Sequence, residues 1–150
     1  MTHEQRASED RIAVQAVIDR FFAGFTSGTR AEAGAADLRE VLLPGAVLVQ
    51  TAGEEPVVYD VDGFIGPRLA LLTSGTLSDF REAATSGQTV LFGDIAQHWC
   101  SYEKMWRQDG ADHAGAGAKG FQLVRTAAGW RISALVWEDE RPGLSLPPRD

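Results

Sequence analysis

The stretch Gly129-Trp130-Arg131-Ile132-Ser133-Ala134-Leu135-Val136-Trp137 decides how this chain is expected to fold. Its branched and aromatic residues are typical of a β-strand. Strict alternation along the strand divides the residues between two faces: Trp130, Ile132, Ala134 and Val136 on one, Arg131, Ser133, Leu135 and Trp137 on the other. Because both faces carry apolar bulk, we expect the chain's own helices to cover one face and a second subunit to cover the other.

Further extended segments precede this strand, and turn residues separate them. Ser86-Gly87-Gln88 and Ala127-Ala128-Gly129 predict hairpin turns, and the glycine- and alanine-rich residues 108–119 predict a mobile loop. Gly53-Glu54-Glu55-Pro56 predicts the turn of a short upstream hairpin. The expected strands are residues 46–51, 57–60, 77–84, 89–106 and 120–125.

Three helices are expected before the long strands. The first begins at Ser8 as its N-cap and ends near Thr26-Ser27-Gly28. The second covers residues 30–43, and the third begins at Asp62, with Pro67 as a kink inside it. Helices followed by a meander of strands indicate an α+β fold with the helices on one face of a strongly curved, mixed, mainly antiparallel sheet. Such a cone encloses a pocket, which is the place to look for a ligand.

Length and composition exclude several classes of protein. The 150 residues, 44% of them hydrophobic, predict a single domain over 1–150, with an ordered core at about 9–140 and tails at 1–8 and 141–150. The formal net charge of -7 argues against a nucleic-acid partner and an anionic membrane surface. No apolar run is long enough to span a membrane and the N-terminus lacks the order of a signal peptide, so we expect a cytoplasmic protein.

A family resemblance rests on four stretches: residues 62–68 (DGFIGPR), residues 71–77 (LLTSGTL), Tyr102-Glu103, and residues 121–125 (FQLVR) leading into Gly129-Trp130-Arg131-Ile132. With the order of elements, they resemble the nuclear transport factor 2-like superfamily and, more narrowly, its small bacterial proteins of unknown function related to the SnoaL-like group. The superfamily includes ketosteroid isomerase, dehydratases, epoxide hydrolases and polyketide cyclases, but also binding and scaffolding proteins without a reaction. The resemblance therefore implies the cone fold and leaves the function to the site.

Candidate catalytic residues lie on two of the expected strands. Alternation along residues 89–106 puts one set of side chains in the cavity, unless a bulge at Gly93 reverses part of it: Val90, Phe92, Asp94, Ala96, His98, Cys100 and Tyr102. In this set His98 could transfer protons and Tyr102 could donate to an oxyanion; the favoured alternative is that both are ordinary buried polar residues satisfied by their neighbours. Glu82 shares a strand face with Phe80, where a half-dry setting suits a general base, although a surface glutamate is the common alternative.

The remaining pocket candidates are mainly aromatic. Arg68 could clamp a carboxylate at the cavity mouth, or pair with Asp60, Asp62 or Glu82. The aromatic candidates could equally form core wall, and Cys100 could be a small buried hydrophobe. The expected ligand-binding set is Phe22, Tyr59, Phe64, Arg68, Phe80 and Cys100.

No spacing of histidines, cysteines and carboxylates predicts a metal site, and no phosphate loop is present, so we expect no cofactor. The sequence favours a protein that binds a small apolar organic molecule, with cofactor-free acid/base chemistry of isomerase, dehydratase or polyketide-cyclase type as one possibility. The alternative is a non-catalytic dimeric association or scaffold module. In either case a homodimer is expected through an outer sheet face that carries Trp99, Leu135 and Trp137.

Overall fold

The computed structural model describes residues 1–148, and over this range the chain forms three α-helices, one turn of 3-10 helix and six strands. The strands make one sheet in the order β2-β1-β6-β5-β4-β3, in which β1 runs parallel to β6 and all other neighbours are antiparallel. The elements are α1 (His3–Ala23), η1 (Gly28–Arg30), α2 (Ala31–Val41), β1 (Leu42–Thr51), β2 (Val57–Tyr59), α3 (Val61–Thr73), β3 (Ser78–Phe92), β4 (Ile95–Gln108), β5 (Ala111–Thr126) and β6 (Gly129–Asp139).

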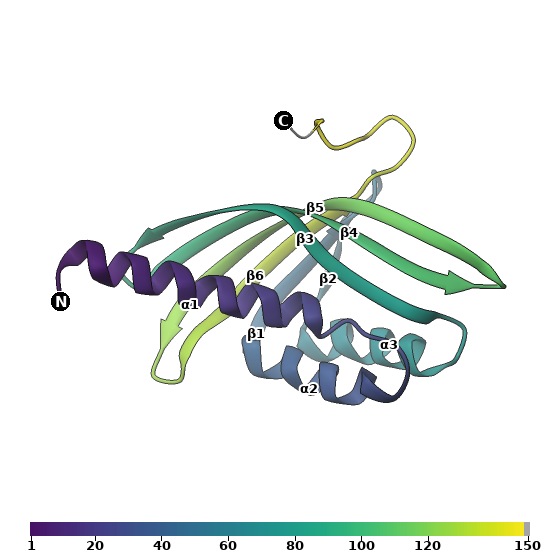
Figure 1. The fold of residues 1–150 in the computed structure, drawn as a ribbon, viewed down its shortest axis with the longest axis horizontal. Coiled ribbons are helices and arrows are strands. Elements are labelled where there is room, and N and C mark those ends of the chain that lie inside the picture. The colour runs from purple at the N-terminus through teal and green to yellow at the C-terminus, as the bar shows by residue number, and fades with distance from the viewer. Residues whose placement is uncertain (149–150) are drawn as a thin grey trace.

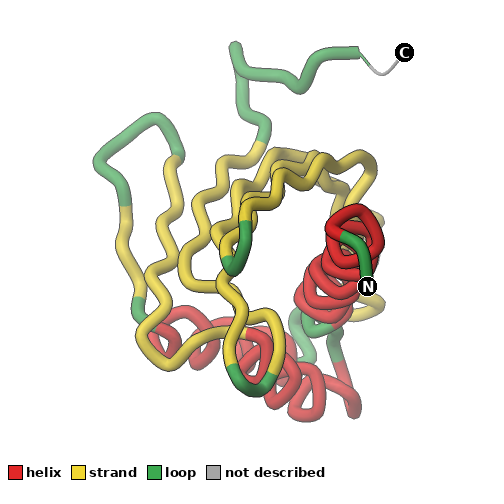
Figure 2. Tube along the Cα trace, turned by 90° about the vertical axis from the view of Figure 1, so that its left-hand side faces the viewer, coloured by secondary structure: helices red, strands yellow, loops and turns green. Residues whose placement is uncertain are grey.

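The helices lie on the concave side of a strongly curved sheet, as Figure 1 and Figure 2 show. The sheet is not closed, because β2 and β3 form its two edges. The C-terminal segment leaves on the opposite, convex side (Figure 1). The predicted α+β cone is therefore confirmed. None of the described helices is both long and apolar enough to cross a membrane.

Helix α1 begins six residues earlier than predicted. Thr2, and not Ser8, is its N-cap: the Thr2 hydroxyl accepts from the Gln5 amide at 3.1 Å, and the Gln5 side chain accepts from the Thr2 amide at 2.7 Å. This capping box satisfies two N–H groups that a helix start leaves free, so residues 3–8 are helical and the expected frayed tail is wrong. The buried positions have helical spacing: Val14, Val17, Ile18, Phe21 and Phe22.

The other helix boundaries also differ from the prediction. Helix α2 stops at Val41 because Leu42 is already extended and starts β1, which continues through Pro44 and Gly45 as an irregularity in its pairing with β6. The cap of α3 is Asp60, whose carboxylate accepts from the Gly63 amide at 2.7 Å. The predicted cap, Asp62, lies inside the first turn of α3, whereas an N-cap is the residue just before that turn.

Two tight turns replace the connections expected between the long strands. Residues 86–88 lie inside β3, and the chain reverses instead at Gly93 and Asp94, where Gly93 has φ +56°. Residues 111–119 belong to β5, because Asp109 and Gly110, both with positive φ, form a two-residue hairpin turn. The predicted strand over residues 89–106 is thus two strands, and Val90 and Phe92 are exposed instead of facing the cavity.

A bulge in β6 changes which side chains face the helices. Ile132 pairs with Leu123 and Ala134 pairs with Gln122, so Ser133 is an extra residue on β6. The extra residue reverses the alternation, and Leu135 and Trp137 are buried on the concave side together with Trp130 and Ile132. The prediction that Leu135 and Trp137 lie on the outer face is wrong. Trp99, 62% exposed, does lie there.

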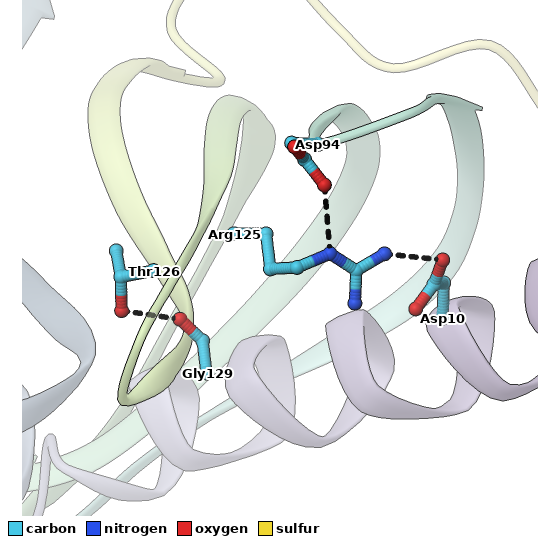
Figure 3. Close-up of polar contacts among 5 residues, drawn as sticks. All are labelled: Asp10, Asp94, Arg125, Thr126 and Gly129. Atoms are coloured by element: carbon cyan, nitrogen blue, oxygen red, sulfur yellow. Dashed lines mark hydrogen bonds and ion pairs between the residues drawn. The ribbon is translucent and has the colours of Figure 1, made fainter.

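An ionic network fixes the N-terminal half of α1 to the ends of the long strands (Figure 3). Arg125 on β5 bonds Asp94 in the β3–β4 turn at 2.9 Å and Asp10 on α1 at 2.7 Å. In the neighbouring β5–β6 turn the Thr126 hydroxyl donates to the Gly129 oxygen at 2.7 Å. Further along α1, the Phe21 ring packs edge-on against Phe121 of β5 and Phe25. The helix is thereby positioned across the concave face at both ends.

Candidate functional site

A cavity of about 320 Å³ lies between α3 and the concave face of the sheet. Six elements and their connections contribute to its wall, so the cavity depends on the whole fold. Apolar side chains make up more than half of the lining, and charged or amide groups make up all of the rest. The lining residues are Phe25, Gln50, Phe64, Pro67, Arg68, Leu71, Leu72, Leu77, Phe80, Glu82, Lys104, Lys119, Trp137 and Asp139.

A buried ion pair forms part of this wall. Lys119 Nζ on β5 lies 2.9 Å from Glu82 Oε1 on β3, and the two side chains are only 6% and 7% exposed. Among the described residues no donor makes a hydrogen bond of good geometry to Glu82 Oε1. The ion pair with Lys119 is therefore the main interaction that offsets the loss of hydration of this oxygen. Burial lowers the pKa of Lys119, and Glu82 acts in the opposite direction. The Lys119 ammonium also lies 4.0 Å from the centre of the Tyr102 ring.

A second polar group lies next to the pair. The Tyr102 hydroxyl donates to Asp139 Oδ1, and Lys104 Nζ lies 2.8 Å from Asp139 Oδ2. Burial raises the pKa of Tyr102, and its bond to Asp139 raises it further, so the phenol stays protonated. Burial alone would raise the pKa of Asp139, but the bonds from Lys104 and Tyr102 outweigh it and hold this pKa below its usual value. Asp139 is therefore an ionised acceptor whose two oxygens are both occupied.

Arg68 enters the cavity from α3 and stacks on aromatic rings. Its guanidinium carbon lies 4.1 Å from the centre of the Phe64 ring and 5.3 Å from those of Tyr59 and Trp137. One nitrogen donates to the Phe64 main-chain oxygen at 3.0 Å. Burial lowers the pKa of Arg68, although a guanidinium remains cationic in proteins.

Four of the predicted site residues line the cavity together, namely Phe64, Arg68, Phe80 and Glu82. Others lie behind the lining. The Tyr59 ring stacks on Trp137 at 6.1 Å, and Phe22 and Tyr102 pack beside Lys119. Cys100 is fully buried, and burial raises the pKa of its thiol to about 11, so it is a small core residue and not a thiolate nucleophile.

His98 lies on the same face of β4 as Tyr102 but does not line the cavity. It borders a separate groove, about 530 Å³, between α1 and β3, and Glu82 borders both hollows. Its Nδ1 lies 2.7 Å from the Thr89 hydroxyl, and its ring rests against Gly87, where a Cβ would come within 2.9 Å of Nε2. Burial lowers the pKa of His98, with Asp19 acting in the opposite direction. His98 therefore shares a groove with Glu82 but does not line the cavity that holds Lys119.

Several cavity residues escaped the sequence reasoning, Lys119, Lys104, Asp139 and Trp137 among them. Lys119 falls in the segment interpreted as a loop. Read as strand, it alternates with Phe121 and Leu123 and so faces the core, and this signal was present in the sequence. Among residues 1–148 no three His, Cys, Asp or Glu side chains gather as a metal site would need.

Comparison with solved structures identifies the fold. A structure of an NTF2-like protein of unknown function from Silicibacter pomeroyi matches with TM-score 0.64 at 20% identity, over 93% of this chain and all of the other. The chain has the nuclear transport factor 2-like fold. An NTF2-like protein with a cystatin-like fold from Novosphingobium aromaticivorans matches with TM-score 0.68 at 20% identity, over 90% of this chain and 84% of the other.

A ketosteroid isomerase-like protein from Erwinia carotovora atroseptica also shares the fold, with TM-score 0.63 at 17% identity over 87% of this chain and 96% of the other. Neither a protein-family model nor a curated protein sequence matches the chain. At these sequence identities the similarity shows the fold alone. Any inference about function must therefore come from the side chains of the cavity.

Proposed function

We propose that the chain binds a small, largely apolar organic molecule in the cavity between α3 and the sheet. The observation that carries the proposal is the buried Glu82–Lys119 pair set in a wall of aromatic and aliphatic side chains. Burying two charges costs free energy that an apolar pair of the same volume would not cost, so such a pair in a cavity wall points to a use. A ligand that carries both an apolar body and a polar group fits this wall.

The same pair suits cofactor-free acid/base chemistry of isomerase, dehydratase or polyketide-cyclase type. The Glu82 carboxylate would accept a proton from a carbon beside a carbonyl, and the Lys119 ammonium would donate a hydrogen bond to the oxygen as negative charge develops there. Tyr102 and Asp139 would position Lys119 and the cavity floor. His98 has no part in this proposal, because it lies in the other groove. Membership of the SnoaL-like branch and a cytoplasmic location stay predictions.

Blocking the cavity mouth tests ligand binding. Leu71 lines the cavity and is 46% exposed, so Leu71→Trp should leave the fold intact and place an indole across the entrance. We expect small aromatic and alicyclic carbonyl compounds to raise the melting temperature of the wild type and to have no effect on this variant. The matched control is Ile12→Trp, which puts the same indole on the exposed face of α1 and should behave as wild type. Equal shifts in Leu71→Trp and wild type would place binding elsewhere.

A second candidate function, dimeric association, has one observation in its favour. The convex face of the sheet exposes apolar side chains at neighbouring positions: Val47, Val90, Ile95, Trp99 and Val136. Exposed apolar patches of this kind on a sheet commonly mark a contact with another protein. A homodimer through this face, with Trp99 and Val136 in place of the misassigned Leu135 and Trp137, is compatible with ligand binding on the concave side.

Light scattering at micromolar concentration checks this association. The wild type should have the mass of a dimer, and Trp99→Glu should be a monomer because it buries a charge in the contact. Ile12→Glu adds the same charge on α1 and should leave the dimer intact. A monomeric wild type would end the dimer proposal without affecting the cavity.

A further inference from the structure

We infer that the ligand of the cavity carries a carboxylate, and that Arg68 binds it. This inference rests on the proposed function, since it concerns the chemical class of the molecule that occupies the same cavity. Arg68 lines that cavity beside Leu72 and Phe80, so an anion at the guanidinium would have an apolar wall next to it.

Arg68 has donors to spare. Its hydrogen bond to the Phe64 oxygen and its interaction with the Tyr59 hydroxyl engage at most two of the five N–H groups of a guanidinium. No carboxylate of residues 1–148 lies within ion-pair distance of it, which excludes the predicted pairing with Asp60, Asp62 or Glu82. Glu82 and Asp139 are near enough to favour its charge, but neither forms an ion pair with it, so this half-buried guanidinium, open to the cavity, keeps N–H groups for an anion.

The charges of the cavity wall do not balance. Its cations are Arg68, Lys104 and Lys119, and its anions are Glu82 and Asp139. Glu82 pairs with Lys119, and Asp139 pairs with Lys104, so Arg68 is the cation left over. The whole chain has a formal charge of -7, so a local excess of positive charge in this cavity runs against the general sign. A monoanionic ligand would neutralise it.

The form of the guanidinium selects among anions. It is a planar fork that matches a carboxylate with two parallel hydrogen bonds, and here the Phe64, Tyr59 and Trp137 rings around it hold that plane in place. The rings also exclude water, which strengthens a charged hydrogen bond. The class that fits best is a monocarboxylate with an aromatic or alicyclic body.

Paired probes of the same shape test the inference. In titrations followed by calorimetry, 2-naphthoate should bind the wild type at least about tenfold more tightly than the neutral 2-naphthamide, because one charged hydrogen-bonded contact contributes roughly that much. Acetate, which has the anion without the ring, should bind far more weakly than 2-naphthoate. Arg68→Gln should remove the preference, so that this variant binds the acid no more tightly than the amide.

Two further variants test whether the preference depends on Arg68 itself and on the form of its guanidinium. Arg131 is also half-buried and also donates to a main-chain oxygen, at 2.8 Å, but lies outside the cavity, so Arg131→Gln should retain the preference. Arg68→Lys keeps the charge without the fork and should show a smaller preference than wild type. Equal binding of acid and amide by wild type would overturn the inference while the proposed function stands. Absence of binding by both would overturn the two together.

Discussion

Replacing Lys119 by methionine should lower the free energy of unfolding by about 3–5 kcal/mol, the largest effect expected for one substitution in this chain. Methionine fills nearly the same volume but leaves the Glu82 carboxylate buried without its counter-charge. The loss would come from the desolvated carboxylate and not from a missing contact, since Lys119 is itself costly to bury. Urea unfolding monitored by circular dichroism measures this change in the free energy of unfolding.

A double variant distinguishes the cost of an unpaired buried carboxylate from that of poor packing. In Lys119→Met combined with Glu82→Leu neither charge of this buried pair remains, and the double variant should recover most of the lost stability. Arg39→Met serves as the control, because the Arg39–Asp62 pair is 51% and 83% exposed and should contribute less than about 1 kcal/mol. A Lys119→Met protein as stable as wild type would contradict a desolvated pair at this position.

Substituting Gly117 by alanine should cost about 3 kcal/mol. Gly117 pairs with Tyr102 on one side and Asp139 on the other, and its missing side chain leaves the space through which the Tyr102 hydroxyl reaches the carboxylate. A Cβ there would meet the Glu138 oxygen and the Tyr102 hydroxyl, and would lie 2.7 Å from Tyr102 Cζ. The tyrosine would have to move, which would break its bond to Asp139.

The same change at Gly66 is the matched control for Gly117→Ala. Gly66 lies in α3, is exposed, and a Cβ there meets nothing within 4 Å. Alanine at this position should change stability by less than about 1 kcal/mol, because its helix propensity is opposed by the following Pro67, which disfavours a Cβ on the helical residue before it. If both glycine variants changed stability alike, the close approach of Tyr102 and Asp139 beside Gly117 would not be as described.

The glycines also show where sequence reasoning succeeded and failed. The alanines and glycines of residues 114–118 resemble a flexible loop in isolation, yet Gly117 lies in a strand and makes room for Tyr102 on β4. That role depends on the cross-strand partner, which lies 15 residues away in the sequence and is set by the register of the sheet. The Asp109-Gly110 pair, by contrast, is a local hairpin signal that could have been recognised.

The overall architecture could be predicted because apolar periodicity and turn residues are local. The bulge at Ser133 could not, since it arises from pairing β6 with two different neighbours, and it reversed the predicted faces of Leu135 and Trp137. The candidate site was found in part, since Arg68 and Glu82 were named from their aromatic neighbours. Lys119 was missed because its segment was interpreted as a loop, and Asp139 because its partners lie on β4.

Native mass spectrometry of the full chain with a neutral and an acidic aromatic compound tests most directly the claim that the cavity is a ligand site. The wild type should retain one small molecule per chain, Ile12→Trp should do the same, and Leu71→Trp should retain none. A wild-type protein that stays free of ligand, or a Leu71→Trp protein that binds as the wild type does, would contradict the claim.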